Sequence, residues 1–372
     1  MEEYELVKEL EATFDENLQI LLTTNGGLEK VVEEELTERL ETIDLQPQQI
    51  KTRPLGYDGH VLIELKSGLT TIWPILKQLR SIHHIIFLMD SFSLPQADHL
   101  VHIPSRLKQL ALPFMKAGRT FRITANRTGN QRYGSMDVQR AAGQLIDERF
   151  PCAVDLEQHD INIRVDVYKN QCLIGLQLTN TSLANRYNRS YRPRISLKPH
   201  IAYGMVHEAN LPNESLKILD PFCGSGSILM EAGHIYPDWD LYGSDLYQNA
   251  IEGAYNNLKR ENLEGRVELR QADVLELHHY FNADFFDAII TNPPYGIKLS
   301  RNKDYALFYK NLLKETAIVL KPGGKLVMLA MKWSQLKNLV VNKTQFTIRK
   351  LSRLETGDLH PRLFVLEKIK EV

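Results

Sequence analysis

Leu216-Lys-Ile-Leu-Asp220-Pro-Phe-Cys-Gly224-Ser-Gly226 is the stretch that decides the fold of the second half of the chain. Its first residues suit a buried strand, an acid ends that strand, and a glycine-rich turn opens the next helix. Glycines in such a turn let the backbone approach a ligand closely, because no Cβ intrudes. The stretch predicts a strand–turn–helix unit that binds a small molecule, with a tight turn that binds nothing as the alternative.

Strands and helices alternate on both sides of this stretch. We expect strands at 215–219, 240–244, 267–271, 286–291 and 325–330, and helices at 201–210, 227–234, 247–261 and 305–320. Two last strand-like runs, at 345–354 and 363–369, have no clear helix between them. This alternation is typical of an α/β fold with a doubly wound parallel sheet, and the last two runs indicate an antiparallel hairpin at its edge.

Acids follow three successive strands of this sheet. Asp245 stands 25 residues after Asp220, and Asp273 ends the third strand. The carboxyl ends of parallel strands share the edge where ligands bind, so these acids suit an ammonium, a ribose and an adenine amino group. Asp245 could instead cap a helix. A dinucleotide site is the other alternative, but Leu229 stands where its third glycine would be, and Asp220 would repel a pyrophosphate.

The segment Phe286-Asp-Ala-Ile-Ile-Thr-Asn292-Pro293-Pro294-Tyr295-Gly296 indicates the chemistry. An exocyclic amine of a base is a poor nucleophile, because its lone pair is delocalised into the ring. The side-chain oxygen of Asn292 and the carbonyl of Pro293 could accept its two N–H bonds and aim that lone pair. Tyr295 could stack on a base lifted out of its helix. The alternative is a rigid loop whose asparagine begins a turn.

These residues resemble the class I methyltransferases that modify amino groups of nucleic-acid bases, over residues 199–372. The resemblance includes the turn Leu320-Lys-Pro-Gly-Gly324. It implies S-adenosyl-L-methionine as the methyl donor and Asn292, Pro293 and Tyr295 as catalytic residues. The cofactor-binding residues it implies are Pro199, His200, Asp220, Phe222, Cys223, Gly224, Ser225, Gly226, Asp245, Leu246, Asp273, Val274 and Asn292.

The first half of the chain predicts α+β units. Strands are expected at 60–65, 85–90 and 120–125, helices at 28–40, 71–79 and 136–149, and a hairpin at 162–168 and 172–178. This half resembles a ferredoxin-like subdomain joined to a THUMP domain, on Leu22-Thr-Thr-Asn-Gly-Gly27-Leu28-Glu29 and on Phe121-Arg122-Ile123 with Arg127. THUMP domains bind RNA, commonly the 3′ end of tRNA. We expect an acidic extension at 1–17, the subdomain at 18–95, the THUMP domain at 96–182, a basic linker at 183–198 and the methyltransferase domain at 199–372.

The charge of the chain is unevenly distributed. Its 372 residues have a net charge of −1, with 43% hydrophobic and 24% charged residues. Residues 106–140 nevertheless contain eight Lys or Arg and one acid, and residues 186–198 contain five and none. Local clusters of this kind neutralise RNA phosphates, although basic runs are often only solvated surface. The candidate RNA-binding residues are Arg122, Arg127, Arg186, Arg189 and Arg192.

Both halves together resemble the THUMP-containing guanine-N2 methyltransferases. The ending Gly357-Asp-Leu-His-Pro361-Arg362 is similar to the branch that acts on guanosine 6 of the tRNA acceptor stem. The branch for large-subunit ribosomal RNA is the alternative, and a branch acting on guanosine 10 usually has Asp in place of Asn292. A DNA adenine-N6 enzyme and a non-catalytic RNA-binding protein are further alternatives.

Three cysteines, Cys152, Cys172 and Cys223, are too few and too widely spaced to imply disulfides or a zinc cluster. No apolar run approaches the roughly 20 residues that span a bilayer, and the first residues lack a secretory pattern. We therefore expect a cytoplasmic enzyme that acts on RNA as a monomer, without a metal.

Overall fold

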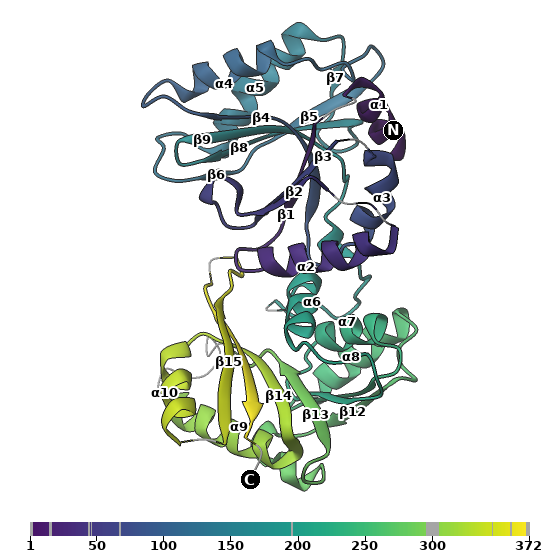
Figure 1. Cartoon of the computed structure of the whole chain (residues 1–372), viewed down its shortest axis with the longest axis vertical. Coiled ribbons are helices and arrows are strands. Elements are labelled where there is room, and N and C mark those ends of the chain that lie inside the picture. Colours follow the sequence, from purple (N-terminus) through teal and green to yellow (C-terminus); the bar gives the residue numbers. More distant parts are fainter. Residues whose placement is uncertain are drawn as a thin grey trace. The chain divides into compact units, whose positions relative to one another are not determined.

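The computed structural model describes residues 3–14, 17–43, 45, 47–66, 68–194, 196–294, 305–343, 345–357 and 359–369. The chain forms two compact units, and each is built from two stretches of sequence (Figure 1). The first contains Met1–Thr24 and Val32–Leu183, and the second contains Asn25–Val31 and Ala184–Val372.

The described strands of the first unit form one mixed sheet, in the order β2-β3-β1-β4-β9-β8-β5-β7 with β6 beside β8. These strands are β1 (Leu18–Thr23), β2 (Gln49–Thr52), β3 (His60–Leu65), β4 (His84–Ser93), β5 (Thr120–Thr124), β6 (Arg127–Thr128), β7 (Ala153–Val154), β8 (Ile161–Tyr168) and β9 (Gln171–Gln177). The helices are α1 (Glu3–Thr13), α2 (Glu29–Leu40), α3 (Leu69–Gln78), α4 (His99–Gln109) and α5 (Ser135–Arg149). The first three residues of α2 belong to the second unit.

The core of this unit lies between the sheet and its helices. Strand β8 supplies Ile163 and Val165 to this core, because alternate residues of a strand point to the same face. Helix α1 contributes Leu6, Val7 and Leu10, all buried, and it packs against α3. The segment expected as an acidic extension is therefore an amphipathic helix of the first unit.

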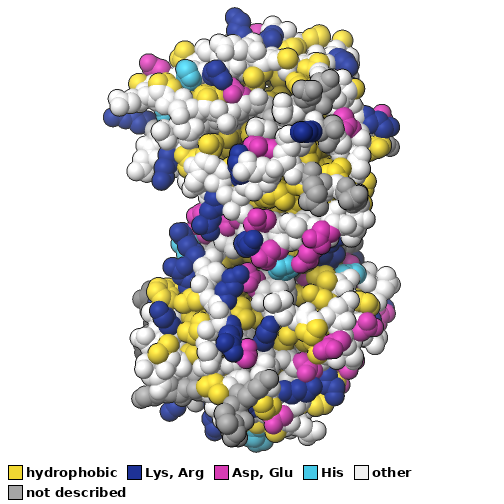
Figure 2. Space-filling model, in the orientation of Figure 1, with side chains coloured by type: hydrophobic (Ala, Val, Ile, Leu, Met, Phe, Trp, Pro, Cys, Tyr) yellow, Lys and Arg dark blue, Asp and Glu magenta, His cyan; other side chains and the backbone are white. Residues whose placement is uncertain are grey.

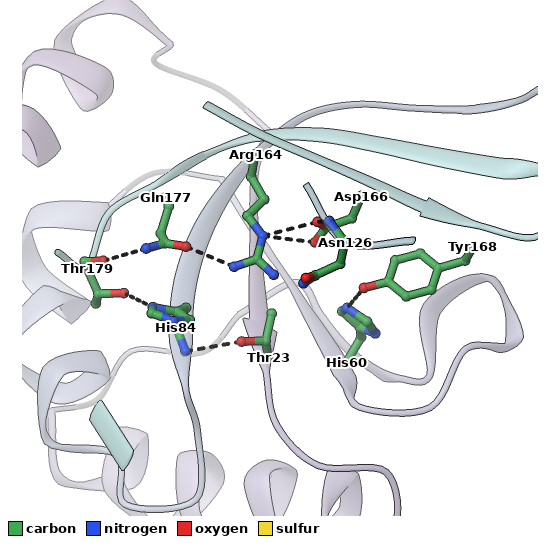
Figure 3. Close-up of polar contacts among 9 residues, drawn as sticks. All are labelled: Thr23, His60, His84, Asn126, Arg164, Asp166, Tyr168, Gln177 and Thr179. Atoms are coloured by element: carbon green, nitrogen blue, oxygen red, sulfur yellow. Dashed lines mark hydrogen bonds and ion pairs between the residues drawn. The ribbon is translucent and has the colours of Figure 1, made fainter. Parts of the chain in front are cut away.

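The other face of the sheet carries a buried polar network (Figure 3). The Nε of Arg164 lies 3.1 Å from Oδ2 of Asp166, and its Nη1 donates a 2.9 Å hydrogen bond to Oε1 of Gln177. The Nε2 of Gln177 donates to the carbonyl of Thr179, whose Oγ1 lies 3.0 Å from Nδ1 of His84. Burial, together with the positive charge of Arg164, lowers the pKa of His84 to about 4. The ring is thus neutral at pH 7, and the network ties β4, β8 and β9 together.

The second unit is an α/β domain. Its elements are α6 (Pro199–Glu208), β10 (Lys217–Asp220), α7 (Ser227–Ile235), β11 (Asp240–Asp245), α8 (Gln248–Arg260), β12 (Val267–Gln271), β13 (Phe286–Thr291), α9 (Tyr305–Val319), β14 (Leu320–Ala330), α10 (Trp333–Lys343), β15 (Phe346–Arg353) and β16 (Arg362–Lys368). The sheet order is β12-β11-β10-β13-β14-β16-β15. All pairs from β12 to β14 are parallel, and β16 runs antiparallel to both β14 and β15.

Helices cover both faces of this second sheet. Ile218 and Ile290 point to the core shared with α6, α7 and α8, whereas their neighbours Leu219 and Ile289 point to the core shared with α9 and α10. Burial on both faces explains the continuous apolar runs of β10 and β13. The carboxyl ends of the parallel strands lie at one edge of the sheet. Asp220, Asp245 and Asp273 lie at these ends of β10, β11 and β12.

The structure confirms the predicted α/β fold with an antiparallel pair at its edge, and it adds elements that the sequence analysis missed. Helix α10 lies between β14 and β15, and α4 follows β4. Residues 25–31 belong to the second unit rather than to the predicted subdomain at 18–95, because Leu28 and Val31 are buried in its core. The remaining domain boundaries stay predictions. Within the described residues, no helix is long and apolar enough to cross a membrane.

Candidate active site

The glycine-rich turn joins β10 to α7 and is held against the next strand. The amide of Cys223 donates a 2.9 Å hydrogen bond to the carbonyl of Ser244, and the amide of Gly224 donates to Oδ2 of Asp245 at 3.1 Å. Gly224 has φ of 51° and Gly226 has φ of 80°, a region that side chains with a Cβ rarely adopt. The backbone of the turn thus favours glycine at both positions, and α7 begins directly after the turn, as predicted.

Asp220 ends β10 and is almost fully buried. Only 2% of its surface is exposed, and its Oδ1 accepts hydrogen bonds from Oγ1 of Thr291 at 2.7 Å and from the amide of Phe222 at 3.2 Å. Burial raises the pKa of Asp220 to about 7, and the nearby charge of Asp245 adds to the rise. A cationic ligand would therefore stabilise the ionised carboxylate.

Asp245, at the end of β11, is half-buried. Its Oδ2 accepts from the amide of Gly224, and its Oδ1 accepts from the amide of Tyr247 at 3.1 Å. Burial raises the pKa of this carboxyl. Asp245 therefore orders the turn and the start of α8, while each oxygen retains a lone pair for a ligand hydroxyl. The neighbouring Leu246 is 51% exposed, as an apolar wall of a ligand site would be.

Asp273 follows β12 and caps the short 3₁₀ helix Val274–His279. Its Oδ1 accepts a 2.9 Å hydrogen bond from the amide of Leu275. No hydrogen bond to its Oδ2 is found among the described residues, so the capping role leaves one oxygen for a ligand. Val274, beside it, is buried. The structure thus brings all three acids to the carboxyl ends of adjacent strands.

Asn292 follows the last residue of β13 at the same edge of the sheet. Its Oδ1 is buried, and no described residue donates a hydrogen bond to it. A buried acceptor without a donor is uncommon in folded proteins and suits a ligand N–H. Pro293 is buried beside it, whereas Tyr295, the third expected catalytic residue, lies outside the described residues.

Pro199 and His200 begin α6, and His200 is fully buried. Its Nε2 lies 2.6 Å from Oδ1 of Asn25, whose Nδ2 donates to the carbonyl of Glu355 at 2.6 Å. The sequence pattern indicated His200 as a cofactor residue but gave no indication of its partner Asn25. The Asn25-Gly26-Gly27 turn was the one available signal, but nothing local links it to a site more than 170 residues away.

The basic linker is tied to the glycine-rich turn. The Nη1 of Arg189 donates to Oγ of Ser196 and Oγ of Ser227, and Oγ of Ser196 lies 2.8 Å from Oγ of Ser225. Burial lowers the pKa of Arg189. These contacts fix the position of the turn and give Arg189 a structural role.

The other candidate RNA-binding arginines differ in their surroundings. Arg186 forms a 3.0 Å ion pair with the buried Glu231. Arg122 donates to the carbonyl of Leu156 at 3.0 Å, and Arg127 donates to that of Gly129 at 2.6 Å. Arg192 is exposed. RNA contact by these five arginines stays a prediction, and Arg192 has the most accessible guanidinium of the linker candidates.

The three cysteines lie in the described residues, as do most of the side chains that could ligate a metal. Cys152, Cys172 and Cys223 are free and buried, and burial raises the pKa of each thiol. A protonated thiol is a poor nucleophile. No group of three His, Cys, Asp or Glu residues with metal-binding geometry is found in the described ranges.

Comparisons with known proteins agree with this geometry. Residues 102–177 match the THUMP domain, and residues 186–362 match the RMKL-like methyltransferase domain of the UPF0020 family. The crystal structure of TrmN from Thermus thermophilus has a TM-score of 0.75 and 27% identity, over 95% of this chain and 100% of that one. SMU.472, a putative methyltransferase complexed with SAH, has the same fold, with a TM-score of 0.71 and 18% identity over 96% of this chain and 99% of that one.

Two of the relatives in sequence illustrate the activities that their names print. The tRNA (guanine(6)-N2)-methyltransferase of Thermus thermophilus is 29% identical over 78% of this chain and 85% of that protein. The U6 snRNA (guanine-N(2))-methyltransferase THUMPD2 of Homo sapiens is 30% identical over 56% of this chain and 40% of that protein. The fold and the site thus define a class I methyltransferase. Within that class, the chain combines a THUMP domain with an RMKL-like methyltransferase domain of the UPF0020 family model.

Proposed function

We propose that this protein transfers a methyl group from S-adenosyl-L-methionine to the exocyclic N2 of guanosine 6 in the acceptor stem of tRNA. The observation that carries the proposal is the buried Oδ1 of Asn292, to which no described residue donates, at the edge of the sheet where Asp220 and Asp245 also lie. An acceptor beside a site for a cationic cofactor is the arrangement that methylation of an amine requires.

The described residues fit S-adenosylmethionine. The buried carboxylate of Asp220 suits the ammonium of the methionyl group, Asp245 suits the ribose hydroxyls, and the remaining oxygen of Asp273 suits the adenine amino group. Gly224 and Gly226 allow close approach of the backbone. When bound, the cofactor supplies a methyl group on a positively charged sulfur.

The catalytic residues act by accepting hydrogen bonds. Asn292 Oδ1 and the Pro293 carbonyl take the two N–H bonds of the guanine amino group, and this directs the nitrogen lone pair towards the methyl group. The nitrogen would form its new bond to the methyl carbon that the sulfonium gives up, the cofactor would leave as a neutral thioether, and the nitrogen would release one proton to water. Tyr295 is proposed to stack on the base. Catalysis then rests on positioning rather than on a nucleophilic side chain.

The names of the relatives favour tRNA. Three proteins named tRNA (guanine(6)-N2)-methyltransferase, from Thermus thermophilus, Archaeoglobus fulgidus and Methanocaldococcus jannaschii, match 63–78% of this chain. The THUMP domain supports an RNA substrate. These matches favour tRNA over ribosomal RNA, and the site favours an enzyme over a non-catalytic RNA-binding protein. We further propose that the enzyme is a cytoplasmic monomer, which light scattering and cell fractionation would test.

One labelling experiment tests the substrate and the chemistry together. The purified protein is incubated with labelled S-adenosylmethionine and unmodified total RNA, and the RNA is digested to nucleosides. The expected product is N2-methylguanosine at position 6 of tRNA. The same nucleoside in ribosomal or small nuclear RNA would overturn the substrate, and label on adenine would overturn the base.

A further inference from the structure

Trp333 is an exposed tryptophan at the start of α10. Its exposed fraction is 37%, against 5% for Trp73 and 2% for Trp239, the two other tryptophans of the chain. An accessible indole ring offers a flat apolar face on which a planar ligand group can stack. Its neighbours in space indicate what that ligand group is.

Trp333 lies at the edge of the sheet where the candidate active site lies. Strands β13 and β14 are parallel, with Thr291 paired with Met328, so Asn292 and the end of β14 at Ala330 lie at the same edge. Trp333 follows Ala330 by three residues and begins α10 (Figure 1). The tryptophan therefore follows the strand that is adjacent to the one ending before Asn292.

Arg362 lies over the ring of Trp333. The centre of its guanidinium is 5.2 Å from the ring centroid, and Arg362 is paired with Ala330 across β14 and β16. No carboxylate or carbonyl partner of this guanidinium is found in the part of the chain that the structure describes. Other arginines over rings differ, since Arg106 pairs with Asp90 and Arg270 with Glu268.

The surrounding sequence is strongly basic. Residues 316–354 contain eight Lys or Arg and no Asp or Glu. Five of the eight bind carboxylates or carbonyls of the second unit: Lys321, Lys325, Arg349, Lys350 and Arg353. Among the others, Lys332 and Lys337 are exposed, and no partner of either is found among the described residues. Lys337 stands four residues after Trp333 on α10, a spacing that places two side chains on one face of a helix, and Lys332 immediately precedes Trp333 in the chain.

We propose that Trp333 and Arg362, flanked by Lys332 and Lys337, form a subsite in which an unstacked RNA nucleotide adjacent to the target guanosine stacks on the indole ring. The inference rests on the proposed function. A guanine within a duplex stem must leave its stack before its amino group is accessible, and its neighbour then loses a stacking partner. An aromatic face replaces that partner, and the cations bind the flanking phosphates.

RNA suits this surface better than a protein partner does. The unpaired groups are all cations, as phosphate recognition requires, and an arginine beside an aromatic ring stacks on bases of any sequence. The face of the protein that Figure 2 shows mixes positive, negative and apolar side chains. The sequence on both sides of Trp333 differs from this mixture, because residues 316–354 contain no acid.

The test combines kinetics with tryptophan fluorescence, and its probe is an unmodified transcript of a tRNA with guanosine at position 6. We expect Trp333→Ala to raise KM for this transcript by about tenfold, with kcat and the affinity for S-adenosylmethionine within twofold of the wild type. Trp333→Phe, which keeps a ring, should recover most of the loss. Tyr255→Ala is the matched control, because Tyr255 is 47% exposed on α8, across the sheet from α10.

Fluorescence reads the contact directly. Trp73 and Trp239 are buried, so emission that acrylamide quenches comes mainly from Trp333, and Trp333→Phe supplies the background. Binding of the transcript should quench this emission and protect it from acrylamide. Wild-type KM for Trp333→Ala, or emission that RNA leaves accessible, would overturn the subsite. Absence of N2-methylguanosine from wild-type reactions would overturn the proposed function instead, since the fluorescence measurement needs no turnover.

Discussion

The hydroxyl of Thr291 donates a 2.7 Å hydrogen bond to Oδ1 of Asp220, and both side chains are buried. Thr291 is the residue immediately before Asn292. The strand that ends at the candidate catalytic amide therefore also holds the acid proposed for the cofactor. Through this bond, the two halves of the candidate site are placed by one pair of adjacent strands.

Binding of S-adenosylmethionine should depend on pH. Burial, and secondarily the charge of Asp245, raise the pKa of Asp220 to about 7, while Thr291 and the amide of Phe222 oppose the rise. The thiol of Cys223, close by, stays neutral because burial raises its pKa. The cofactor needs the carboxylate, so we expect its stabilisation of the protein to grow from pH 6 to pH 8. Thermal shifts at saturating cofactor check this.

For the protein without cofactor, the raised pKa of Asp220 gives stability the opposite dependence on pH. Between pH 4 and pH 7 the native state binds the Asp220 proton more tightly than the unfolded state does. This group's contribution to the free energy of unfolding therefore falls as the pH rises through that window. A cofactor effect that is constant from pH 6 to pH 8 would contradict the role of Asp220.

Thr291→Val should weaken cofactor binding at pH 7. Valine keeps the volume but removes the hydrogen bond that lowers the pKa of Asp220, so more of the acid is protonated. The pH midpoint of cofactor binding should move upward, as isothermal titration over several pH values would show. Thr291→Ser restores the hydroxyl and should restore the midpoint. An unmoved midpoint in the valine variant would leave Thr291 with a packing role only.

Asn292→Ala should lower kcat by about 10²- to 10³-fold while leaving cofactor affinity unchanged. The alanine variant removes a buried oxygen that has no described donor, so the free energy of unfolding should not fall. Single-turnover methylation and chemical denaturation measure the two quantities. An equal loss in cofactor affinity would show that Asn292 serves the cofactor and not the base.

Asp245→Ala should weaken both the cofactor and the fold. The carboxylate accepts from the amides of Gly224 and Tyr247, and the loss of these bonds costs about 1–3 kcal/mol. Asp245→Asn keeps one acceptor oxygen, so it should lose less cofactor affinity and less stability than the alanine variant. Titration with S-adenosylmethionine, run beside urea denaturation, separates the effects. Unchanged affinity in a folded alanine variant would remove Asp245 from the site.

Arg189 and Arg192 should respond differently to alanine. Arg189→Ala breaks the contacts with Ser196 and Ser227, so we expect a stability loss of about 1–3 kcal/mol and weaker cofactor binding. Arg192→Ala should leave stability unchanged and reduce the salt dependence of RNA binding by about one unit of slope. Filter binding at several salt concentrations measures the salt dependence of RNA binding by each variant. Identical behaviour of the two variants would contradict a structural role for Arg189 and an RNA-binding role for Arg192.

Patterns that are local in sequence were sufficient for most of the second unit. The apolar run before Asp220 and the glycine turn fixed a strand and a helix, because burial on both faces of a parallel sheet leaves continuous apolar sequence. Helix α10 was missed because the segment after Ala330 mixes Lys, Ser and Gln with apolar residues in a weak helical pattern. The tie between His200 and Asn25 was out of reach, since no local propensity reports a contact across 175 residues.

Asp273, which caps a helix, and Arg189, which is partly buried, show a second limit of predicting site residues from the sequence. Sequence reasoning assigned one to adenine and the other to RNA, from charge and position alone. The structure gives Arg189 hydroxyl and carbonyl partners inside the second unit, and it gives Asp273 a helix to cap. A charged residue near a site can serve the backbone, a ligand or both, and only its neighbours decide which.

The assignment of residues 25–31 to the second unit has a consequence for synthesis. Asn25 bonds to the carbonyl of Glu355, a separation of 330 residues. At about 5–20 residues per second, roughly 15 to 65 seconds of translation separate the two partners. During this interval Leu28 and Val31 lack the core residues against which they pack in the folded protein, and they are accessible to chaperones. A fragment cut at Pro199 would never complete this closure, so the catalytic half is not a module that gene fusion could transfer intact.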